Sequence, residues 1–454
     1  MARLADLQRI HIVGGGGAGM SGLAKILSQQ GHVVSASDLK PSRFLDSLED
    51  LGIATWLGHR PAEMEGIDLL AASSAVPASD PELRAAAAAG ALVWSRPELL
   101  DALTRRLPAF GFTGTHGKTT STAMAVTAFR QLGLDPTFLV GGELVGYNTG
   151  AHLGSDAEFV LEADEAFGTF RHLHLTALQV TNIEADHLDF YGNVAALEEA
   201  FALVATRVDG PVLACIDDAG VKRLAERVEV TTYGVAGDAK WRLDDIRHGA
   251  GAVAFRLVRG RREIEVEVPR PGHHVALNAA GVLAVLGELG YDVARAAAGL
   301  ASFAGVRRRF DIRARIRGVT IVDDYAHHPT EIAATIAAGR LGGWRRVWAV
   351  FQPHRYSRTA ELAPRFGEPL AAADRVVVTD VYGAGEAPLP GVSGRLVAEA
   401  TSAAGGQVEY VPALSDVADR VSPQLEDGDL VLLLGAGDIN SLADPIATRV
   451  GAGG

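Results

Sequence analysis

The segment AFGFTGTHGKTTSTAMAV, residues 109–126, contains an apolar run, a glycine-rich turn and a helix-like stretch in direct succession. An apolar run before such a turn is typical of a buried strand of a parallel sheet. Glycines let the backbone N–H groups of the turn point at an anion, and the N-terminus of the next helix adds a positive dipole end. The segment therefore predicts a strand, a phosphate-binding loop and a helix of an α/β domain.

The turn itself supplies the groups that a nucleoside triphosphate needs. We expect Lys118 to bridge the β- and γ-phosphates and the Thr119 hydroxyl to hold Mg²⁺. The full G-x-x-x-x-G-K-[ST] pattern would have glycine at Phe112, so Gly114 begins a shortened form. The chain has only five lysines, and one of them in this turn favours ATP over an ordinary glycine turn. The predicted ATP-binding residues of this loop are Gly114, Thr115, His116, Gly117, Lys118, Thr119 and Thr120.

A second glycine-rich turn lies near the N-terminus, in HIVGGGGAGM at residues 11–20. Its Gly14, Gly16 and Gly19 have the G-x-G-x-x-G spacing of a dinucleotide-binding loop, and Asp38 follows about 20 residues later, where an acidic residue binds a ribose hydroxyl. One hypothesis is therefore an NAD-dependent oxidoreductase. That hypothesis leaves the phosphate loop and the C-terminal third of the chain without a role.

The remaining pattern extends this organisation along the chain. Apolar runs alternate with helical stretches, which predicts α/β domains with parallel sheets. Between about residues 228 and 268 the pattern alternates around a turn at Gly260, which predicts an added antiparallel hairpin. The predicted domains are residues 1–107, 108–311 and 312–454.

Composition narrows the class of protein. The net charge of −13 argues against a general nucleic-acid or anionic-membrane binder. Cys215 is the only cysteine, so a disulfide framework is excluded and a reducing compartment is expected. The N-terminus has no apolar core of a signal peptide, and no apolar run is long enough to predict a membrane-spanning helix. We therefore expect a soluble, cytoplasmic protein.

Acidic residues gather after two predicted strands that neighbour the phosphate loop. Carboxyl ends of parallel strands meet at one edge of a sheet, so these groups should face the loop together. Phosphoryl transfer needs Mg²⁺ to neutralise charge, and the clusters suit a metal site. The first cluster comprises Glu162, Asp164 and Glu165 in EADE. The second comprises Asn182, Glu184, Asp186 and His187 in TNIEADH.

Seven segments then occur in a fixed order: GTHGKTT, EADE, TNIEADH, PGHHVALNAAGV, GVRRRFD, DDYAHHPTE and FQPHRYSRT. Together, from residue 10 to about 440, the chain resembles the Mur ligase family, ATP-dependent amino-acid ligases of cell-wall precursor synthesis. It is most similar to the branch that adds L-alanine to UDP-N-acetylmuramate. The resemblance implies a Rossmann-like UDP-binding domain, a P-loop ATPase-type central domain and a Rossmann-like C-terminal domain.

The resemblance also implies a reaction and residue roles. ATP would convert the lactyl carboxylate of UDP-N-acetylmuramate to an acyl phosphate, which the amine of L-alanine attacks. Lys118 would hold the γ-phosphate, Thr119 and Glu162 one Mg²⁺, and His187 a second. Further ATP contacts would come from Asn278 to the adenine, Arg309 to the phosphates and Asp324 to the ribose or the metal shell.

The other substrates would be bound by the two outer domains. The resemblance implies that Tyr325, His327, Arg355 and Arg358 bind the amino acid, and His327 and the two arginines join Lys118 and His187 as catalytic residues. An arginine can hold the α-carboxylate in a bidentate pair. The first glycine loop would then bind the UDP diphosphate rather than NAD, through Gly14, Gly16, Gly17, Gly19 and Asp38.

Three departures from the family pattern stand out. Ala166 replaces a usual serine, Val275 replaces a frequent asparagine, and no lysine between Lys118 and Lys222 could be carbamylated as in several sibling ligases. A non-enzymatic ATP-binding switch is the remaining alternative, but it does not explain the arginines and histidines of the C-terminal domain. We expect a monomer or weak homodimer.

Overall fold

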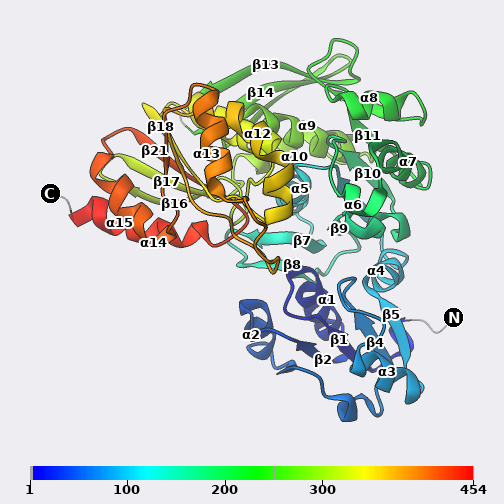
Figure 1. The fold of residues 1–454 in the computed structure, drawn as a ribbon. Helices are drawn as coiled ribbons and strands as arrows, with labels where there is room; N and C mark the ends of the chain where they lie inside the picture. Colours follow the sequence, from blue (N-terminus) through cyan, green and yellow to red (C-terminus); the bar gives the residue numbers. More distant parts are fainter. Residues whose placement is uncertain (1–3, 250, 453–454) are drawn as a thin grey trace. The chain divides into compact units, whose positions relative to one another are not determined.

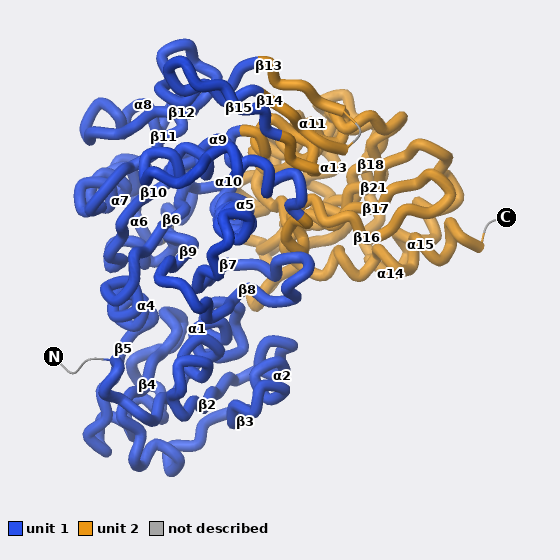
Figure 2. Tube along the Cα trace, turned by 180° about the vertical axis from the view of Figure 1, so that it is seen from behind, with its two compact units in different colours: residues 1–244, 256–266, 277–303 blue, residues 245–255, 267–276, 304–454 orange. Residues whose placement is uncertain are grey.

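The computed structural model describes residues 4–249 and 251–452. The chain divides into two compact units, coloured separately in Figure 2. Unit 1 comprises residues 1–244, 256–266 and 277–303, and unit 2 comprises residues 245–255, 267–276 and 304–454. Three sheets run through these units, and helices cover them, as Figure 1 shows.

The first sheet is parallel throughout and has the strand order β3-β2-β1-β4-β5. This order, with β1 at the centre, is that of a Rossmann-like domain. Its strands are β1 (Arg9–Val13), β2 (Val33–Asp38), β3 (Ala54–Leu57), β4 (Leu69–Ala72) and β5 (Leu92–Ser95). Its helices are α1 (Ala18–Gln29), α2 (Arg43–Glu49), α3 (Pro81–Ala88) and α4 (Arg96–Thr104), with short 3-10 helices η1 (Leu4–Asp6) and η2 (Pro61–Met64).

The second sheet has ten strands in the order β15-β14-β13-β12-β11-β10-β6-β9-β7-β8. The central strands are parallel, and β7 and β8 pair antiparallel at one edge. The strands are β6 (Ala109–Thr113), β7 (Thr137–Leu144), β8 (Thr149–His152), β9 (Phe159–Glu162), β10 (Ala177–Val180), β11 (Val212–Cys215), β12 (Thr231–Gly234), β13 (Trp241–Gly249), β14 (Ala252–Arg259) and β15 (Arg262–Val268). The helices are α5 (Lys118–Gln131), η3 (Ala166–His172), α6 (Leu188–Tyr191), α7 (Val194–Ala205), α8 (Ala219–Ala225), α9 (His273–Glu288) and α10 (Val293–Leu300).

The third sheet belongs to unit 2 and has the order β16-β17-β21-β18-β19-β20. Only β16 is antiparallel to its neighbour. Its strands are β16 (Asp311–Ile316), β17 (Val319–Asp324), β18 (Arg346–Phe351), β19 (Arg375–Val378), β20 (Val408–Tyr410) and β21 (Asp429–Leu434). Its helices are α11 (Pro329–Leu341), α12 (Tyr356–Ala371), α13 (Gly394–Ala403), α14 (Leu414–Val421), η4 (Ser422–Gln424), η5 (Ile439–Leu442) and α15 (Ala443–Ala452).

The central strands are rich in aliphatic side chains on both faces. Helices therefore cover both faces of the sheets. Every residue of β21 is buried, and separate apolar clusters lie on the two faces of the third sheet. In unit 1 one apolar cluster extends from Leu4 to Leu224 and includes side chains of both the first and the second sheet. Continuous apolar runs of this kind are typical of parallel strands buried on both faces.

The fold prediction is confirmed, including the hairpin after residue 228. Adjacent strands β14 and β15 are joined by Gly260 and Arg261, and Gly260 has a φ of +61°. Sequence reasoning missed β3, β5, β7, β8, β12, β13 and β16, most of which are short or lie toward sheet edges. Partly exposed edge strands carry a weaker apolar signal than buried central strands.

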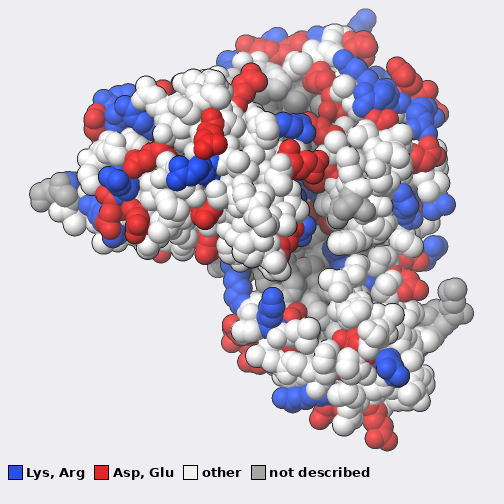
Figure 3. All heavy atoms as spheres, viewed as in Figure 1, with Lys and Arg blue, Asp and Glu red and all other residues white. Residues whose placement is uncertain are grey.

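Surface features agree with the charge balance. On the face drawn in Figure 3, acidic and basic side chains are mixed. None of the helices within the described residues is long and apolar enough to cross a membrane.

Close packing within unit 1 fixes helix α1 of the first sheet against strands β7 and β8 of the second. Gly22 lies at the contact, where an added Cβ would be 2.6 Å from Leu139 Cδ1 and 3.0 Å from Ala151 Cβ. Lys25 on the same helix donates a 3.0 Å hydrogen bond to the Thr149 hydroxyl. The glycine-rich loop that precedes α1 is therefore held at a defined distance from the second sheet.

We predict that Gly22→Leu lowers the free energy of unfolding by about 1–3 kcal/mol, because overpacking a close contact costs this much. Urea denaturation followed by circular dichroism measures it. Gly237→Leu is the matched control, since Gly237 has open space around its Cβ position and no left-handed φ. Equal stability of the two variants would contradict the packing argument.

Candidate active site

The phosphate loop lies between β6 and the N-terminus of α5, as the sequence predicts. Gly114 has a φ of +130° and Gly117, the residue before the helix, a φ of +89°. Both values favour glycine, because a Cβ is disfavoured in this region of φ. Strand β6 pairs with β9 on one side and β10 on the other, so the acidic segments after those strands flank the loop.

The segment after β10 holds the loop from one side. Thr181 donates a 2.6 Å hydrogen bond to the His116 carbonyl, and the Asn182 amide nitrogen donates a 3.0 Å bond to the same oxygen. The Asn182 side-chain oxygen accepts from the His116 N–H at 2.8 Å. An added Cβ on Gly114 would lie 2.1 Å from the Thr181 hydroxyl oxygen. This strap, Thr181 and Asn182, therefore permits only glycine at position 114 and one path for the loop.

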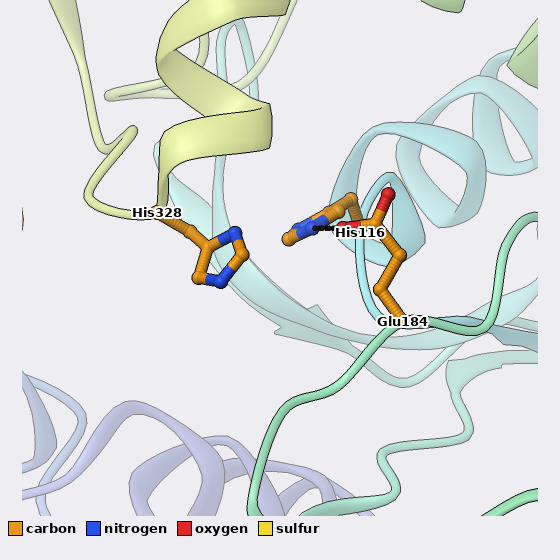
Figure 4. A group of neighbouring side chains, drawn as sticks. All are labelled: His116, Glu184 and His328. Atoms are coloured by element: carbon orange, nitrogen blue, oxygen red, sulfur yellow. Dashed lines mark ion pairs between the residues drawn. The ribbon is translucent and has the colours of Figure 1, made fainter. Parts of the chain in front are cut away.

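Glu184 continues this contact. The Thr115 hydroxyl accepts from the Glu184 N–H at 2.9 Å, and the His116 Nε2 lies 3.4 Å from a Glu184 carboxylate oxygen. Figure 4 shows the His116 and Glu184 side chains turned toward each other. The TNIEADH segment thus positions the loop, a role that sequence reasoning did not assign to it.

Lys118 is the cation of the loop. Its Nζ donates to the carbonyls of Gly114 at 2.7 Å and Thr115 at 3.2 Å, and it lies 2.8 Å from the Glu165 carboxylate. Burial by itself lowers the pKa of Lys118, but the nearby Glu165, Asp164 and Glu162 outweigh it and raise the pKa above its usual value. A permanently charged ammonium is therefore fixed at the N-terminus of α5.

Glu162 and Thr119 meet beside this ammonium. The Thr119 hydroxyl forms a hydrogen bond with the Glu162 side chain, and a Glu162 oxygen accepts from the Gly141 N–H at 2.7 Å. Burial, with the negative charge of Asp164, raises the pKa of Glu162. A hydroxyl and a carboxylate side by side are oxygen ligands of the kind that Mg²⁺ prefers.

His187 lies at the start of α6 with a left-handed backbone, φ 53° and ψ 31°. Its backbone N–H donates to Asp186 at 2.8 Å, and its Nε2 lies 3.9 Å from an Asp186 oxygen. The side chain of His187 therefore lies beside that of Asp186.

Asn278 lies against the loop from helix α9. An added Cβ on Gly117 would be 2.7 Å from the Asn278 side-chain oxygen, and Asn278 is buried. Val275, one turn earlier, is buried too and serves packing rather than a polar contact. Helix η3 begins at Ala166, and the N–H of Ala166 donates a 3.1 Å hydrogen bond to the Asp164 carboxylate. Alanine has no side-chain hydroxyl, so the backbone alone makes this contact.

The first glycine loop is anchored by the end of β2. The N–H groups of Gly14 and Gly15 both donate to the Ser37 carbonyl at 2.9 Å, and the Gly16 N–H donates to Asp38 at 2.9 Å. A Cβ on Gly16 would lie 2.7 Å from an Asp38 oxygen. Asp38 is therefore joined directly to the loop.

Arg96 is a residue near this loop that sequence reasoning missed. A Cβ on Gly19, in the first turn of α1, would lie 3.0 Å from a guanidinium nitrogen of Arg96. Gly17, which precedes the helix, has no neighbour closer than 3.9 Å to its Cβ position. The N-terminus of α1 thus combines a helix dipole with a nearby cation, which suits a diphosphate. No sequence pattern marks Arg96, because it is far from the loop along the chain.

A buried carboxylate supports the same strand end. Glu82 accepts hydrogen bonds from Ser37 at 2.6 Å, from the Trp56 indole at 2.8 Å and from the Arg60 N–H at 2.8 Å. His11 stacks on Trp56 and bonds to Ser37 at 3.1 Å. Burial opposes ionisation of Glu82, but the hydrogen bonds from His11, Ser37, Arg60 and Trp56 outweigh it and lower the pKa to about 2. Glu82 is thus an ionised support beneath the glycine loop.

In unit 2 the predicted residues gather where β16 and β17 meet. Asp324 is buried, and its two oxygens accept from the N–H groups of Phe310 at 2.7 Å and Ala326 at 2.8 Å. Burial raises the pKa of Asp324. Arg309 lies over the ring of Tyr325 at 5.2 Å. Asp324 therefore joins the turn before β16 to the turn after β17.

His327 lies in the loop before α11. Its Nδ1 is 2.9 Å from the Tyr325 carbonyl, and its ring meets the Tyr325 ring edge-on at 5.3 Å. Burial lowers the pKa of His327. His328 and Glu331 form the capping box of α11, which agrees with a structural role for His328.

The FQPHRYSR segment brings its own histidine to this group. The His354 ring lies 5.9 Å from the His327 ring and stacks on Tyr382 at 5.7 Å. Burial, helped by His327, Arg358 and Arg355, lowers the pKa of His354 to about 4. The positive charges of Arg355 and Arg358 therefore both act on His354. His354 was missed as a site residue, although it stands beside Arg355 in the quoted motif.

Three family models match the chain. They are described as "Mur ligase family, catalytic domain" at residues 9–107, "Mur ligase middle domain" at residues 112–286, and "Mur ligase, glutamate ligase domain" at residues 308–437. Together they cover nearly the whole sequence.

Named relatives are similar along their full length. The chain is 44% identical to a UDP-N-acetylmuramate–L-alanine ligase of Mycolicibacterium vanbaalenii, over 99% of this chain and 97% of the relative. It is 44% identical to a ligase of the same name from Kineococcus radiotolerans, over 98% and 96%. The solved UDP-N-acetylmuramate-alanine ligase of Thermotoga maritima has a TM-score of 0.84 and 28% identity, over 98% of this chain and 100% of that one. A murein peptide ligase of Psychrobacter arcticus, with a TM-score of 0.68 and 24% identity, shares the fold.

We predict that Glu82→Gln destabilises the protein near neutral pH and that the difference from the wild type becomes smaller, by about half or more, at pH 3. The pKa of Glu82 falls from 4.5 to about 2 on folding, so its ionised form contributes on the order of 3 kcal/mol above pH 4.5. This contribution is lost as the pH falls from about 4.5 to 2. Urea denaturation of both proteins at pH 6 and pH 3 measures it. A difference that grows in acid would contradict the network.

Proposed function

Because this chain belongs to the Mur ligase family, we propose that it joins L-alanine to the lactyl carboxylate of UDP-N-acetylmuramate with consumption of ATP, as an enzyme of peptidoglycan precursor synthesis. The observation that carries the proposal is the Lys118 ammonium, fixed between the phosphate-loop carbonyls and Glu165 at the N-terminus of α5. This is the position from which a lysine neutralises a transferring γ-phosphate.

The first step is transfer of the γ-phosphoryl group. A lactyl carboxylate oxygen attacks the γ-phosphorus, the bond to the β-phosphate oxygen breaks, and ADP and an acyl phosphate result. Lys118 and the N–H groups of the loop offset the negative charge that spreads over the phosphoryl oxygens. The strap formed by Thr181 and Asn182 keeps these donors in place before the substrate arrives, so little reorganisation is needed.

The second step forms the amide bond. The neutral amine of L-alanine attacks the acyl carbon, a tetrahedral intermediate forms, and phosphate leaves with the electrons of its C–O bond while the nitrogen loses a proton. We assign the amino acid to Tyr325, His327, Arg355 and Arg358 in unit 2. A guanidinium suits the α-carboxylate, and the lowered pKa of His327 leaves its imidazole neutral and able to accept a proton.

Thr119 and Glu162 fit a Mg²⁺ ion, since a hydroxyl and a carboxylate oxygen already meet there. When bound, Mg²⁺ supplies charge neutralisation for the triphosphate. His187 as ligand of a second ion, Asn278 as adenine contact, and Arg309 and Asp324 as further ATP contacts remain predictions.

We assign UDP-N-acetylmuramate to the first glycine loop. Gly14, Gly16, Gly17 and Gly19 form the turn at the N-terminus of α1, and Asp38 borders this turn. The domain boundaries 1–107, 108–311 and 312–454, a cytoplasmic location, and a monomeric or weakly dimeric state complete the proposal.

We predict that phosphate release from ATP requires UDP-N-acetylmuramate and L-alanine together. A coupled phosphate assay with single and double omissions tests this, and mass spectrometry of the product identifies the amino acid that is added. Release that is indifferent to the sugar nucleotide would refute the proposed reaction and favour an ATP-binding switch.

We predict that Lys118→Ala lowers kcat/KM by about 10²–10³-fold or more, because a preorganised charge on the transferring group is lost. Circular dichroism should show that the variant stays folded. Lys222→Ala is the matched control, because Lys222 is an exposed residue of helix α8. This variant should retain full turnover. A Lys118→Ala protein with wild-type kinetics would place ATP elsewhere.

A further inference from the structure

Two exposed aromatic rings lie beside the phosphate loop and take no part in the steps above. Phe167 is 60% exposed and Phe190 47% exposed, and their rings meet edge-on with centroids 6.1 Å apart. Phe167 follows the EADE segment after β9, and Phe190 follows the EADH segment after β10. Large rings are usually buried, so an exposed pair needs an explanation.

The backbone at this pair is strained. Phe167 has φ 54° and ψ 21°, a left-handed conformation that bulky residues rarely adopt. Gly168 follows with φ 67°, and an added Cβ there would lie 3.3 Å from the Phe190 ring. The strained conformation presents the Phe167 ring to solvent instead of burying it. Strain of this kind concentrates at functional sites.

Both rings are connected to Lys118 through Glu165. Phe167 is two residues beyond Glu165, so the two Cα atoms are at most about 7 Å apart, and the Glu165 carboxylate is 2.8 Å from the Lys118 Nζ. Phe190 packs edge-on against Tyr191 at 4.9 Å, and the Tyr191 hydroxyl donates a 2.5 Å hydrogen bond to the Glu165 carbonyl. The pair therefore borders the place where the phosphoryl group is transferred.

We propose that Phe167 and Phe190 form a platform for the sugar ring of UDP-N-acetylmuramate, an inference that rests on the proposed function. In that substrate only two atoms separate the reacting carboxyl carbon from the pyranose ring, so a carboxylate at Lys118 brings the ring close to the platform. The C–H face of a pyranose offers apolar surface to an aromatic ring, and aromatic linings of this kind orient ligands in binding sites.

The other substrates fit this surface less well. The adenine of ATP is separated from the γ-phosphate by the whole triphosphate and the ribose, and the methyl group of L-alanine is too small to cover two rings. The sugar has both the size and the tether that the position requires.

The test uses Phe167→Asn in the full-length protein, because asparagine tolerates the left-handed backbone that Phe167 adopts. We expect the KM for UDP-N-acetylmuramate to rise about 10-fold while the KM values for ATP and L-alanine change less than twofold. Calorimetry should show weaker binding of UDP-N-acetylmuramate and unchanged binding of UDP, which lacks the sugar. Phe167→Tyr should restore most of the lost affinity, because it keeps an aromatic ring. Val235→Asn, at an exposed apolar residue after β12, is the matched control and should resemble the wild type.

Unchanged binding of UDP-N-acetylmuramate by Phe167→Asn would overturn the platform while leaving the ligase reaction intact. Equal weakening of UDP and UDP-N-acetylmuramate would also overturn it, as would a change of sedimentation coefficient with unaltered kinetics, which would mean that the rings contact a second copy of the chain. Failure of the wild type to release phosphate with all three substrates would instead refute the proposed function, and calorimetry would still judge the platform.

Discussion

The hydrogen bonds between Thr181, Asn182 and the backbone of His116 are the constraint on which the glycine-rich loop before α5 depends. They join the carboxyl ends of β6 and β10, neighbours in the sheet although 68 residues separate Thr113 from Thr181. Because no Cβ fits at Gly114, the loop has one available path, and the N-terminus of α5 has one direction. The positions of Lys118 and Thr119 follow from that direction.

The two glycine loops both lead from a strand to the N-terminus of a helix but differ in charge. The loop before α5 carries a lysine surrounded by carboxylates and a threonine beside Glu162, a combination suited to a triphosphate and its metal. The loop before α1 has neither, and its nearby cation is Arg96, contributed by another helix. Backbone N–H groups at a helix N-terminus favour any phosphate, so the surrounding side chains decide which phosphate ester is bound.

Two carboxylates hold loops in place through their hydrogen bonds, Glu82 at the strand end beside the first glycine loop and Asp324 within unit 2. Glu82 is stabilised as an anion by three hydrogen-bond donors, on Ser37, Trp56 and Arg60, whereas Asp324 is buried and holds two turns by accepting backbone N–H groups. Their hydrogen bonds fix loops that a single α/β strand end would leave mobile.

The sequence by itself determined the α/β fold, the two glycine-rich loops and the lysine and threonine that follow the second of them, because each depends on contiguous residues whose spacing sets local backbone geometry. It also placed His327, Arg355 and Arg358 in two short motifs. Only the tertiary structure decided which strand ends meet the loops. It revealed the strap, Arg96, His354 and the exposed rings of Phe167 and Phe190, because those contacts join segments that lie far apart along the chain. Local spacing carries no information about such pairs, since strand order in the sheet brings them together.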